Sequence, residues 1–165
     1  MSNKKFFKKG EADEWFLRNK KGLEQKQNNE DISLLCGWLE PFKKNINDVV
    51  ELGCGSGHKL NSLVEGTGAK GFGVEPSQKA VEYISQKFPS LTAKVGFADA
   101  VPFSQTFDLV HLGFFLYLVD RDKYFRCISE ADRLVKFGGF LSIIRFRNTI
   151  SIFKRIFTPK WYVFT

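Results

Sequence analysis

A glycine-rich turn with a carboxylate close before it is the first place where the sequence could support chemistry. Residues 49–58 read Val-Val-Glu-Leu-Gly-Cys-Gly-Ser-Gly-His, so glycines at 53, 55 and 57 follow Glu51. Glycines let the backbone approach a ligand closely, and the first turn of a helix offers unpaired N–H groups. The Glu51 carboxylate suits a cationic amino group and not a phosphate. The segment therefore predicts a ligand that carries an ammonium.

The spacing of these glycines departs from that of a dinucleotide-binding loop. Such a loop reads G-x-G-x-x-G and holds a pyrophosphate at the helix N-terminus. Here the third glycine, Gly57, comes one residue early, and His58 stands where the pattern requires glycine. A tight strand-to-helix turn without a ligand is the alternative interpretation.

Two further acidic residues stand at the ends of later apolar runs. Glu75 follows the run at residues 71–74, and Asp99 follows the run at residues 93–97. In open α/β sheets, ligands bind beyond the carboxyl ends of the strands, where both carboxylates are expected to lie. Taken singly, each residue is also explained as a helix-capping or surface acid.

Short apolar runs alternate with helical patterns from residue 49 onward. Runs of this kind are typical of parallel strands that are buried on both faces. The alternation predicts an α/β fold: a doubly wound, Rossmann-like, mostly parallel sheet with helices on both faces. The expected strands are residues 49–52, 71–74, 93–97, 107–112 and 140–144, and the expected helices are residues 59–65, 77–88 and 121–136.

The chain divides into a cap and a ligand-binding part. Residues 1–48 are expected to form an N-terminal helical cap segment, and residues 49–165 the ligand-binding domain. A chain of 165 residues suits a single domain overall. The expected elements of the cap are a short helix at residues 11–19, a polar linker at 20–30 and a helix capped by Asp31.

An ordered set of motifs across residues 49–144 resembles the class I S-adenosylmethionine-dependent methyltransferases of the small-molecule type. The first motif of that family has the form E/D-x-G-x-G-x-G, which residues 51–57 match. Further motifs are Gly-Phe-Gly-Val-Glu-Pro-Ser at residues 71–77, Phe-Ala-Asp-Ala at 97–100, Phe-Asp-Leu-Val at 107–110 and the helix and turn at 129–140.

The resemblance implies that S-adenosylmethionine is the methyl donor and S-adenosylhomocysteine the product. It places Glu75 at both ribose hydroxyls and lets Asp99 accept a hydrogen bond from the adenine amino group. A carboxylate in the position of Glu75 serves NAD as well, so an NAD-dependent oxidoreductase is a second alternative function. The implied cofactor-binding residues are Glu51, Gly53, Cys54, Gly55, Gly57, Glu75, Pro76, Asp99, Ala100 and Leu112.

The implied reaction is an in-line displacement, in which an acceptor oxygen, nitrogen or carbon attacks the methyl group on a sulfonium. Alignment of the reacting atoms is the protein's main contribution, so no catalytic base is assigned. Residues 113–118 are expected to face an unidentified small-molecule acceptor, apolar or sugar-like, unless Phe114 and Phe115 are simply packed. They lack the Asn/Asp-Pro-Pro-Tyr/Phe motif of enzymes that methylate nucleic-acid bases. His111 is interpreted as a buried, hydrogen-bonded residue, and Cys54 as a small residue between glycines.

The net charge of +7 lies in the flanks of the chain. Residues 49–144 hold ten basic and ten acidic side chains, whereas residues 145–165 hold five basic and no acidic ones. Basic residues mixed with aromatic ones favour an alternative function, a non-catalytic methyltransferase-like module that binds RNA or a protein. A solvated basic face is the simpler interpretation.

Composition also restricts the partners. No apolar stretch approaches the roughly 20 residues of a membrane-spanning helix, so no membrane partner is expected. Three widely spaced cysteines favour reduced thiols and a cytoplasmic location. With only two histidines, a metal centre would lack ligands, and none is expected.

The remaining expectations concern the two ends of the chain. Family members often carry an N-terminal helix over the cofactor, so Trp15, Phe16 or the neighbouring Arg18-Asn19 pair is expected to cover it, unless these residues pack on the sheet. After the fifth strand, residues 149–157 are expected to form a helix and residues 161–164 a strand. Such a sheet is incomplete at its C-terminal end, and its exposed edge favours a homodimer through residues 145–165.

Overall fold

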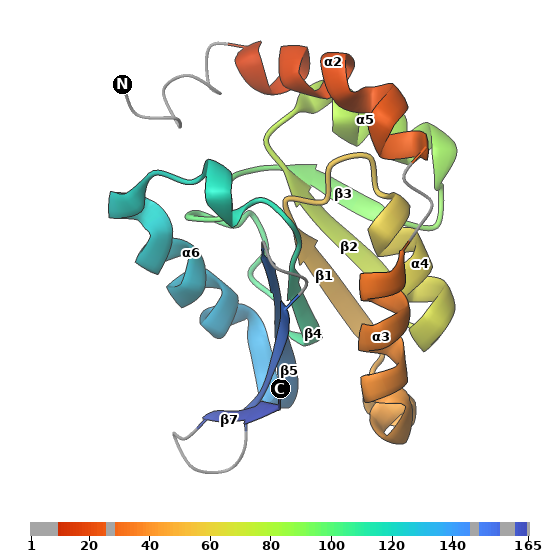
Figure 1. Ribbon diagram of the computed structural model, residues 1–165, viewed down its shortest axis with the longest axis vertical. Coiled ribbons are helices and arrows are strands. Elements are labelled where there is room, and N and C mark those ends of the chain that lie inside the picture. Colours follow the sequence, from red (N-terminus) through yellow and green to blue (C-terminus); the bar gives the residue numbers. More distant parts are fainter. Residues whose placement is uncertain (1–9, 26–28, 146–148, 156–160, 165) are drawn as a thin grey trace.

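The computed structural model describes residues 10–25, 29–145, 149–155 and 161–164, and from Arg145 onward it describes the backbone alone. One sheet has the strand order β3-β2-β1-β4-β5-β6-β7 (Figure 1). Strands β1 to β5 pair in parallel, β6 is antiparallel to β5, and β7 is antiparallel to β6. The strands are β1 Asp48–Leu52, β2 Lys70–Glu75, β3 Thr92–Val95, β4 Phe107–Leu112, β5 Val135–Arg145, β6 Thr149–Arg155 and β7 Trp161–Phe164.

Helices cover both faces of the sheet. A core on one face joins the sheet to α3, α4 and α5, and a second core on the other face joins it to α6. Above the carboxyl ends of the strands, α2 lies across α5 (Figure 1). The helices are α2 Ala12–Gln25, α3 Glu30–Leu39, α4 His58–Thr67, α5 Gln78–Lys87 and α6 Arg121–Leu134, with short 3-10 turns η2 Glu40–Asn45 and η3 Leu116–Leu118.

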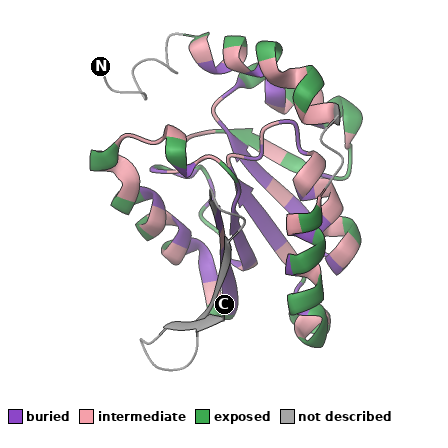
Figure 2. Ribbon diagram, viewed as in Figure 1, coloured by how far each residue is buried: buried purple, intermediate pink, exposed green. Residues whose placement is uncertain are grey.

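The central strands are buried on both faces, as Figure 2 shows. Within β1, Val49 belongs to the core under α3 and α4, and its neighbour Val50 belongs to the core under α6. Such strands consist of continuous apolar residues, which explains why they are recognisable in the sequence. The predicted doubly wound α/β fold is therefore confirmed. Its chain order reverses between β1 and β4, where ligands of open α/β sheets bind.

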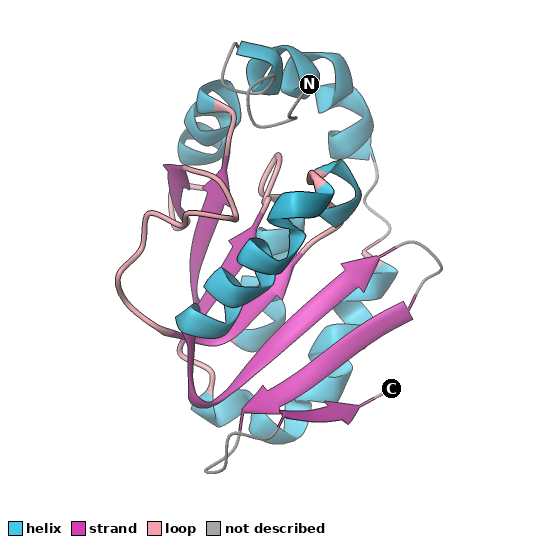
Figure 3. Cartoon of the chain, turned by 90° about the vertical axis from the view of Figure 1, so that its left-hand side faces the viewer, coloured by secondary structure: helices cyan, strands magenta, loops and turns pink. Residues whose placement is uncertain are grey.

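The C-terminal part differs from the prediction. The expected helix at residues 149–157 is wrong, because β6 occupies residues 149–155 and pairs with β5 (Figure 3). Two strands, not one, follow β5, and β7 pairs with β6, so the expectation of an incomplete sheet is also wrong: the sheet has seven strands within the described residues. The spacing of Ile152, Phe153 and Ile156 satisfies a helix, but Ile150 and Ile152 on either side of Ser151 also fit the period of two of a strand. Over so short a run, pairing with the long neighbour β5 decides the outcome.

The cap also differs from the prediction. Helix α2 extends to Gln25, so the start of the expected polar linker is helical, as its many Lys, Glu and Gln residues favour. Asp31 does not cap α3, because the N-cap position belongs to Asn29. Asp31 instead forms an ion pair with Lys59 of α4. By contrast, the helix expected at residues 77–88 is present as α5, and Ser77 caps it with a side chain that accepts a hydrogen bond from the Ala80 backbone.

Candidate functional site

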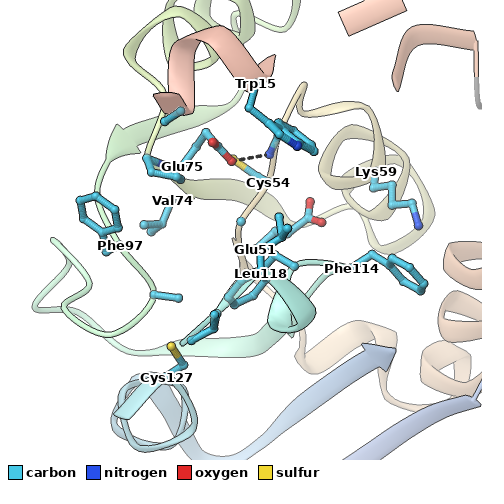
Figure 4. Close-up of a pocket in the computed structure, with 18 of the residues that line it drawn as sticks. Trp15, Glu51, Cys54, Lys59, Val74, Glu75, Phe97, Phe114, Leu118 and Cys127 are labelled. Carbon is cyan, nitrogen blue, oxygen red and sulfur yellow. Dashed lines mark hydrogen bonds between the residues drawn. The ribbon is translucent and has the colours of Figure 1, made fainter. Parts of the chain in front are cut away.

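A cavity of about 230 Å³ lies beyond the carboxyl ends of β1, β2 and β4 (Figure 4). Its walls come from the glycine turn after β1, from the segments after β2 and β3, and from the segment between β4 and α6. Helix α2 contributes Ala12, Trp15 and Leu23 to the lining, and Trp15 lies above the glycine turn in Figure 4. The cavity thus occupies the point of the fold where the strand order reverses.

The glycine turn is shaped by its backbone conformation and by close packing. Gly53, Gly55 and Gly57 have φ values of 72°, 53° and 77°, a region that residues with a Cβ rarely adopt. A Cβ at Gly53 would lie 2.7 Å from the Phe115 ring, and one at Gly57 would lie 2.9 Å from Ile84. A Cβ at Gly55 would meet nothing within 4 Å. Gly55 therefore leaves its backbone open to the cavity.

Glu75 joins the second strand to this turn. The Gly55 backbone N–H donates to Oε2 of Glu75 over 2.9 Å, and the Ser77 N–H donates to Oε1 over 3.2 Å. The side chain is 7% exposed, and this burial raises the pKa of Glu75 to about 7 against the lowering effect of the two N–H groups. Each carboxylate oxygen retains a lone pair for a ligand hydroxyl.

Glu51 lies in the floor of the same cavity. Its carboxylate points into the space below Trp15 (Figure 4), and a Cβ at Gly113 would lie 2.6 Å from Oε1. Among the described residues, Oε2 is buried without a hydrogen-bond partner. Burial raises the pKa of Glu51 to about 8, opposed by the charge of Lys59 and by the Leu60 N–H. An unpartnered buried carboxylate is costly unless a donor or cation joins it.

Asp99 lies at the other end of the cavity. It is 8% exposed, and Lys123 Nζ is 3.8 Å from its Oδ2. Phe97 and Cys127 line the cavity with it. An apolar slot with one acceptor at its edge suits a planar, amino-bearing ring.

The structure brings most of the predicted cofactor-binding residues together. Glu51, Gly53, Cys54, Gly55, Glu75, Pro76 and Asp99 line the cavity. Gly57, Ala100 and Leu112 do not: Gly57 is the N-cap of α4, Ala100 is exposed, and Leu112 is buried in the core under α6. The prediction missed the lining residues Asn29, Lys59, Lys123 and Cys127. Lys59 was detectable, because it follows the glycine turn in the first turn of a helix.

The segment after β4 carries the aromatic residues that were expected to face the acceptor. Both Phe114 and Phe115 line the cavity; Phe115 is packed against Gly53, and Phe114 is 39% exposed. The Tyr117 ring lies 6.0 Å from that of Phe114 and is more exposed. Both predicted phenylalanines thus lie at the cavity, and the more exposed of them, Phe114, stands at its rim.

Helix α2 is fixed to the domain by several contacts. Oδ1 of Asp13 accepts hydrogen bonds from Ser77 Oγ over 2.6 Å and from the Lys79 N–H over 3.0 Å. Phe16 is buried, with its ring 5.8 Å from that of Tyr83. The cap is therefore attached to the N-terminal end of α5, the side on which Glu75 lies.

Two further findings concern metal sites and membrane-spanning helices. In the described ranges, no group of three or more His, Cys, Asp or Glu side chains is placed to hold a metal ion. None of the described helices is long and apolar enough to cross a bilayer.

Comparison with known proteins identifies the family. The model of a family described as "Methyltransferase domain" matches residues 49–139, more than half of the chain, so the protein belongs to this family. The resemblance to class I S-adenosylmethionine-dependent methyltransferases, drawn from the motifs, is thereby confirmed, and S-adenosylmethionine is the cofactor of that class. No curated protein sequence matches the chain.

Solved structures share the fold at low sequence identity. S-adenosylmethionine-bound CalS10, an amino pentose methyltransferase from Micromonospora echinaspora, is 14% identical with a TM-score of 0.66 over 80% of this chain and 66% of that one. The sugar N-methyltransferase KedS8 from Streptoalloteichus is 20% identical, with a TM-score of 0.61 over 74% and 51%. A chain from the complex that contains the Haloferax volcanii Trm112 methyltransferase activator is 24% identical, with a TM-score of 0.63 over 81% and 59%. The present chain thus spans about half to two thirds of these proteins.

Proposed function

We propose that the protein binds S-adenosylmethionine in this cavity and transfers its methyl group to a small-molecule acceptor. The observation that carries the proposal is the unpartnered Oε2 of Glu51, a buried carboxyl group that lines a ligand cavity. The α-ammonium of the cofactor supplies the charge and the donors that this oxygen lacks. NAD has no such group in the corresponding position, so Glu51 favours S-adenosylmethionine over the oxidoreductase alternative.

The three acids would bind successive parts of the cofactor. Glu75, fixed by the Gly55 and Ser77 N–H groups, accepts hydrogen bonds from the ribose hydroxyls. Asp99 accepts one from the adenine amino group in the slot beside Phe97. The bound cofactor supplies an activated methyl group, and the chain's own contribution is to hold the acceptor in line with it and to exclude water.

The acceptor site is proposed at the rim formed by Phe114 and Tyr117. Half-exposed rings at the edge of a cavity suit an acceptor with an apolar or sugar-like face. Two of the structures with the same fold are named as sugar methyltransferases, which supports this acceptor class. Trp15 is proposed to close the cavity from the side of α2.

The non-catalytic module that binds RNA or a protein is the alternative. Its basic and aromatic residues lie at 145–165, outside the side chains that the structure describes. The membership in a methyltransferase family favours the enzyme. A cytoplasmic location is part of the proposal and accords with three free cysteines, Cys36, Cys54 and Cys127.

Titration calorimetry tests the proposed cofactor site. We expect binding of S-adenosylmethionine and S-adenosylhomocysteine, and no binding of NAD. Glu75→Ala should weaken binding by about 1.5–3 kcal/mol, because it removes hydrogen bonds to a charged acceptor. The exposed Glu82→Ala on α5 is the matched control and should bind as the wild type does.

Three results would contradict parts of the proposal. Unchanged affinity in Glu75→Ala would remove this residue from the site, and binding of NAD alone would favour the oxidoreductase. Salt-dependent RNA binding without methyl transfer to any member of an amino-sugar panel would favour the module.

A further inference from the structure

A row of polar side chains crosses the buried face of the sheet beside the candidate site. Glu51 on β1 is in register with His111 on β4, and His111 is in register with Ser142 on β5. Neighbours in register across parallel strands project from the same face of a sheet. All three side chains are at most 2% exposed, so their polar atoms need partners inside the protein.

The hydrogen bonds in this row are incomplete. His111 Nδ1 and Ser142 Oγ are 3.2 Å apart and bonded. Within the described part of the chain, His111 Nε2 and Glu51 Oε2 are both buried and have no partner. Two neighbours in register thus each present one unpaired polar atom on the same face of the sheet.

The protonation of the ring decides whether these two atoms are complementary. Burial lowers the pKa of His111 to about 4, so the ring is neutral near pH 7 and carries one proton. A neutral imidazole has one donor nitrogen and one acceptor nitrogen. When the Ser142 hydroxyl donates to Nδ1, the proton lies on Nε2, which then matches the acceptor Oε2. Once Glu51 is ionised, the other tautomer would leave two buried acceptors on neighbouring strands, which is unfavourable.

We infer that His111 is a positioning residue for Glu51. Ser142 fixes its tautomer, and its Nε2–H hydrogen-bonds to Oε2 of Glu51 through one bound water, which favours the ionised carboxylate and directs it toward the cofactor's ammonium. The inference rests on the proposed function of this cavity. His111 itself is fully buried and does not line the cavity, so it acts through Glu51. The second lone pair of Oε2 accepts from the ammonium.

The other charged groups that act on Glu51 come from three elements. Lys59 on α4 lowers its pKa, whereas Asp31 on α3 and Glu75 on β2 raise it. Lys59 and Asp31 form an ion pair, and both act on His111 as well, with opposite effects. A hydrogen bond to the charged form of an acid lowers its pKa. Loss of the His111 donor therefore leaves less of Glu51 ionised near pH 7.

The test compares His111→Leu with His111→Gln, whose amide retains a donor. Affinity for S-adenosylhomocysteine is measured by calorimetry from pH 6 to pH 8.5 with the full chain. Wild-type affinity should rise with pH as Glu51 ionises. His111→Leu should bind about tenfold more weakly at pH 7, with the difference decreasing toward pH 8.5, because a hydrogen bond to a charged group is lost. His111→Gln should follow the wild-type profile.

Further variants keep the inference open to refutation if His111→Leu does not fold. Ser142→Ala removes the hydroxyl that fixes the tautomer and should displace the profile in the same direction by a smaller amount. Val110→Ala, on the opposite face of the sheet, should lower stability and leave the pH profile unchanged.

Several outcomes overturn the inference. Equal weakening of His111→Leu at every pH, a His111→Gln variant as weak as His111→Leu, or a Ser142→Ala profile identical to the wild type would each show that His111 only fills space. A wild type that binds no S-adenosylhomocysteine overturns the proposed function together with the inference. Wild-type binding that no His111 variant alters overturns the inference alone.

Discussion

At the scale of single residues, the site consists of carboxylates that the fold buries before a ligand arrives. Burial raises the pKa of Glu51 to about 8 and that of Glu75 to about 7. Holding either group ionised in the free protein costs stability, and a bound ammonium or ribose recovers part of that cost. The cofactor-free protein is therefore expected to be less stable than the same fold with neutral side chains in the site.

We expect Glu51→Gln to stabilise the cofactor-free protein at high pH. The carboxyl has an ordinary pKa of 4.5 when unfolded and about 8 when folded, so between these values the unfolded state releases the proton first. Stability from this group is thus present below pH 4.5 and lost as the pH rises to 8. Urea unfolding should show the variant about 2 kcal/mol more stable than the wild type at pH 8 and nearly equal at pH 5.

The same variant should lose affinity for S-adenosylhomocysteine, because a neutral amide does not compensate the ammonium. Glu65→Gln, an exposed change on α4, should alter neither stability nor binding. A Glu51→Gln protein that is less stable than the wild type at pH 8 would contradict the prediction, since it would mean that Glu51 is already well paired without ligand.

The sequence predicted the site residues that follow strand ends and missed those brought in by tertiary packing. Glu51, Glu75 and Asp99 stand next to apolar runs, so their position at one edge of the sheet follows from the parallel topology. Asn29 and Lys123 reach the cavity only because α3 and α6 pack beside it. Nothing local in the sequence marks such residues.

At the scale of the elements, helix α2 has two distinct faces toward the domain. Trp15 lines the cavity, and its neighbour Phe16 is 2% exposed against Tyr83. From the sequence, we expect one of these two residues or the Arg18-Asn19 pair to cover the cofactor, with packing on the sheet as the alternative. The packing interpretation holds for Phe16, whereas a covering role for Trp15 stays a prediction.

Substitution of these two residues should therefore separate binding from stability. Trp15→Ala should weaken binding of S-adenosylhomocysteine with little effect on thermal unfolding, since it removes a partly exposed cavity wall. Phe16→Ala should cost about 3–4 kcal/mol of stability through the cavity that it leaves. Calorimetry and thermal melts on both variants make the comparison. If Trp15→Ala binds as tightly as the wild type, α2 is an ordinary packed helix and does not cover the ligand.

Elements with strong local signals were predicted well, and those set by a neighbouring strand were not. The helix α5 begins with a Ser77 cap and ends before Pro89, so its limits are encoded locally. Strand β6 has no such signal, because its apolar spacing satisfies a helix and a strand alike. Its conformation follows from pairing with β5 over residues 140–145.

At the scale of the whole molecule, the sheet has β3 at one edge and β7 at the other. An edge strand presents unpaired N–H and C=O groups that favour pairing with another chain. The structure corrects the expected helix after β5, but the prediction of an exposed C-terminal edge now applies to β7. A homodimer through residues 145–165 is therefore still a prediction.

A chain that ends at Phe146 tests what β6 and β7 do. It lacks the partner that pairs with residues 140–145 of β5, where Leu141 and Ile144 are buried. Loss of β6 exposes this long strand as a new edge. Light scattering should therefore show the shortened chain to be self-associated and the full chain to be a dimer, and thermal unfolding should show that the shortened chain is less stable. Val163→Lys in the full chain should give a monomer, because a charged edge strand opposes pairing. This monomer should still bind S-adenosylhomocysteine, because the cavity lining ends at Cys127. A stable, soluble monomer from both the shortened and the full chain would show that the C-terminal strands neither complete the sheet nor form an interface.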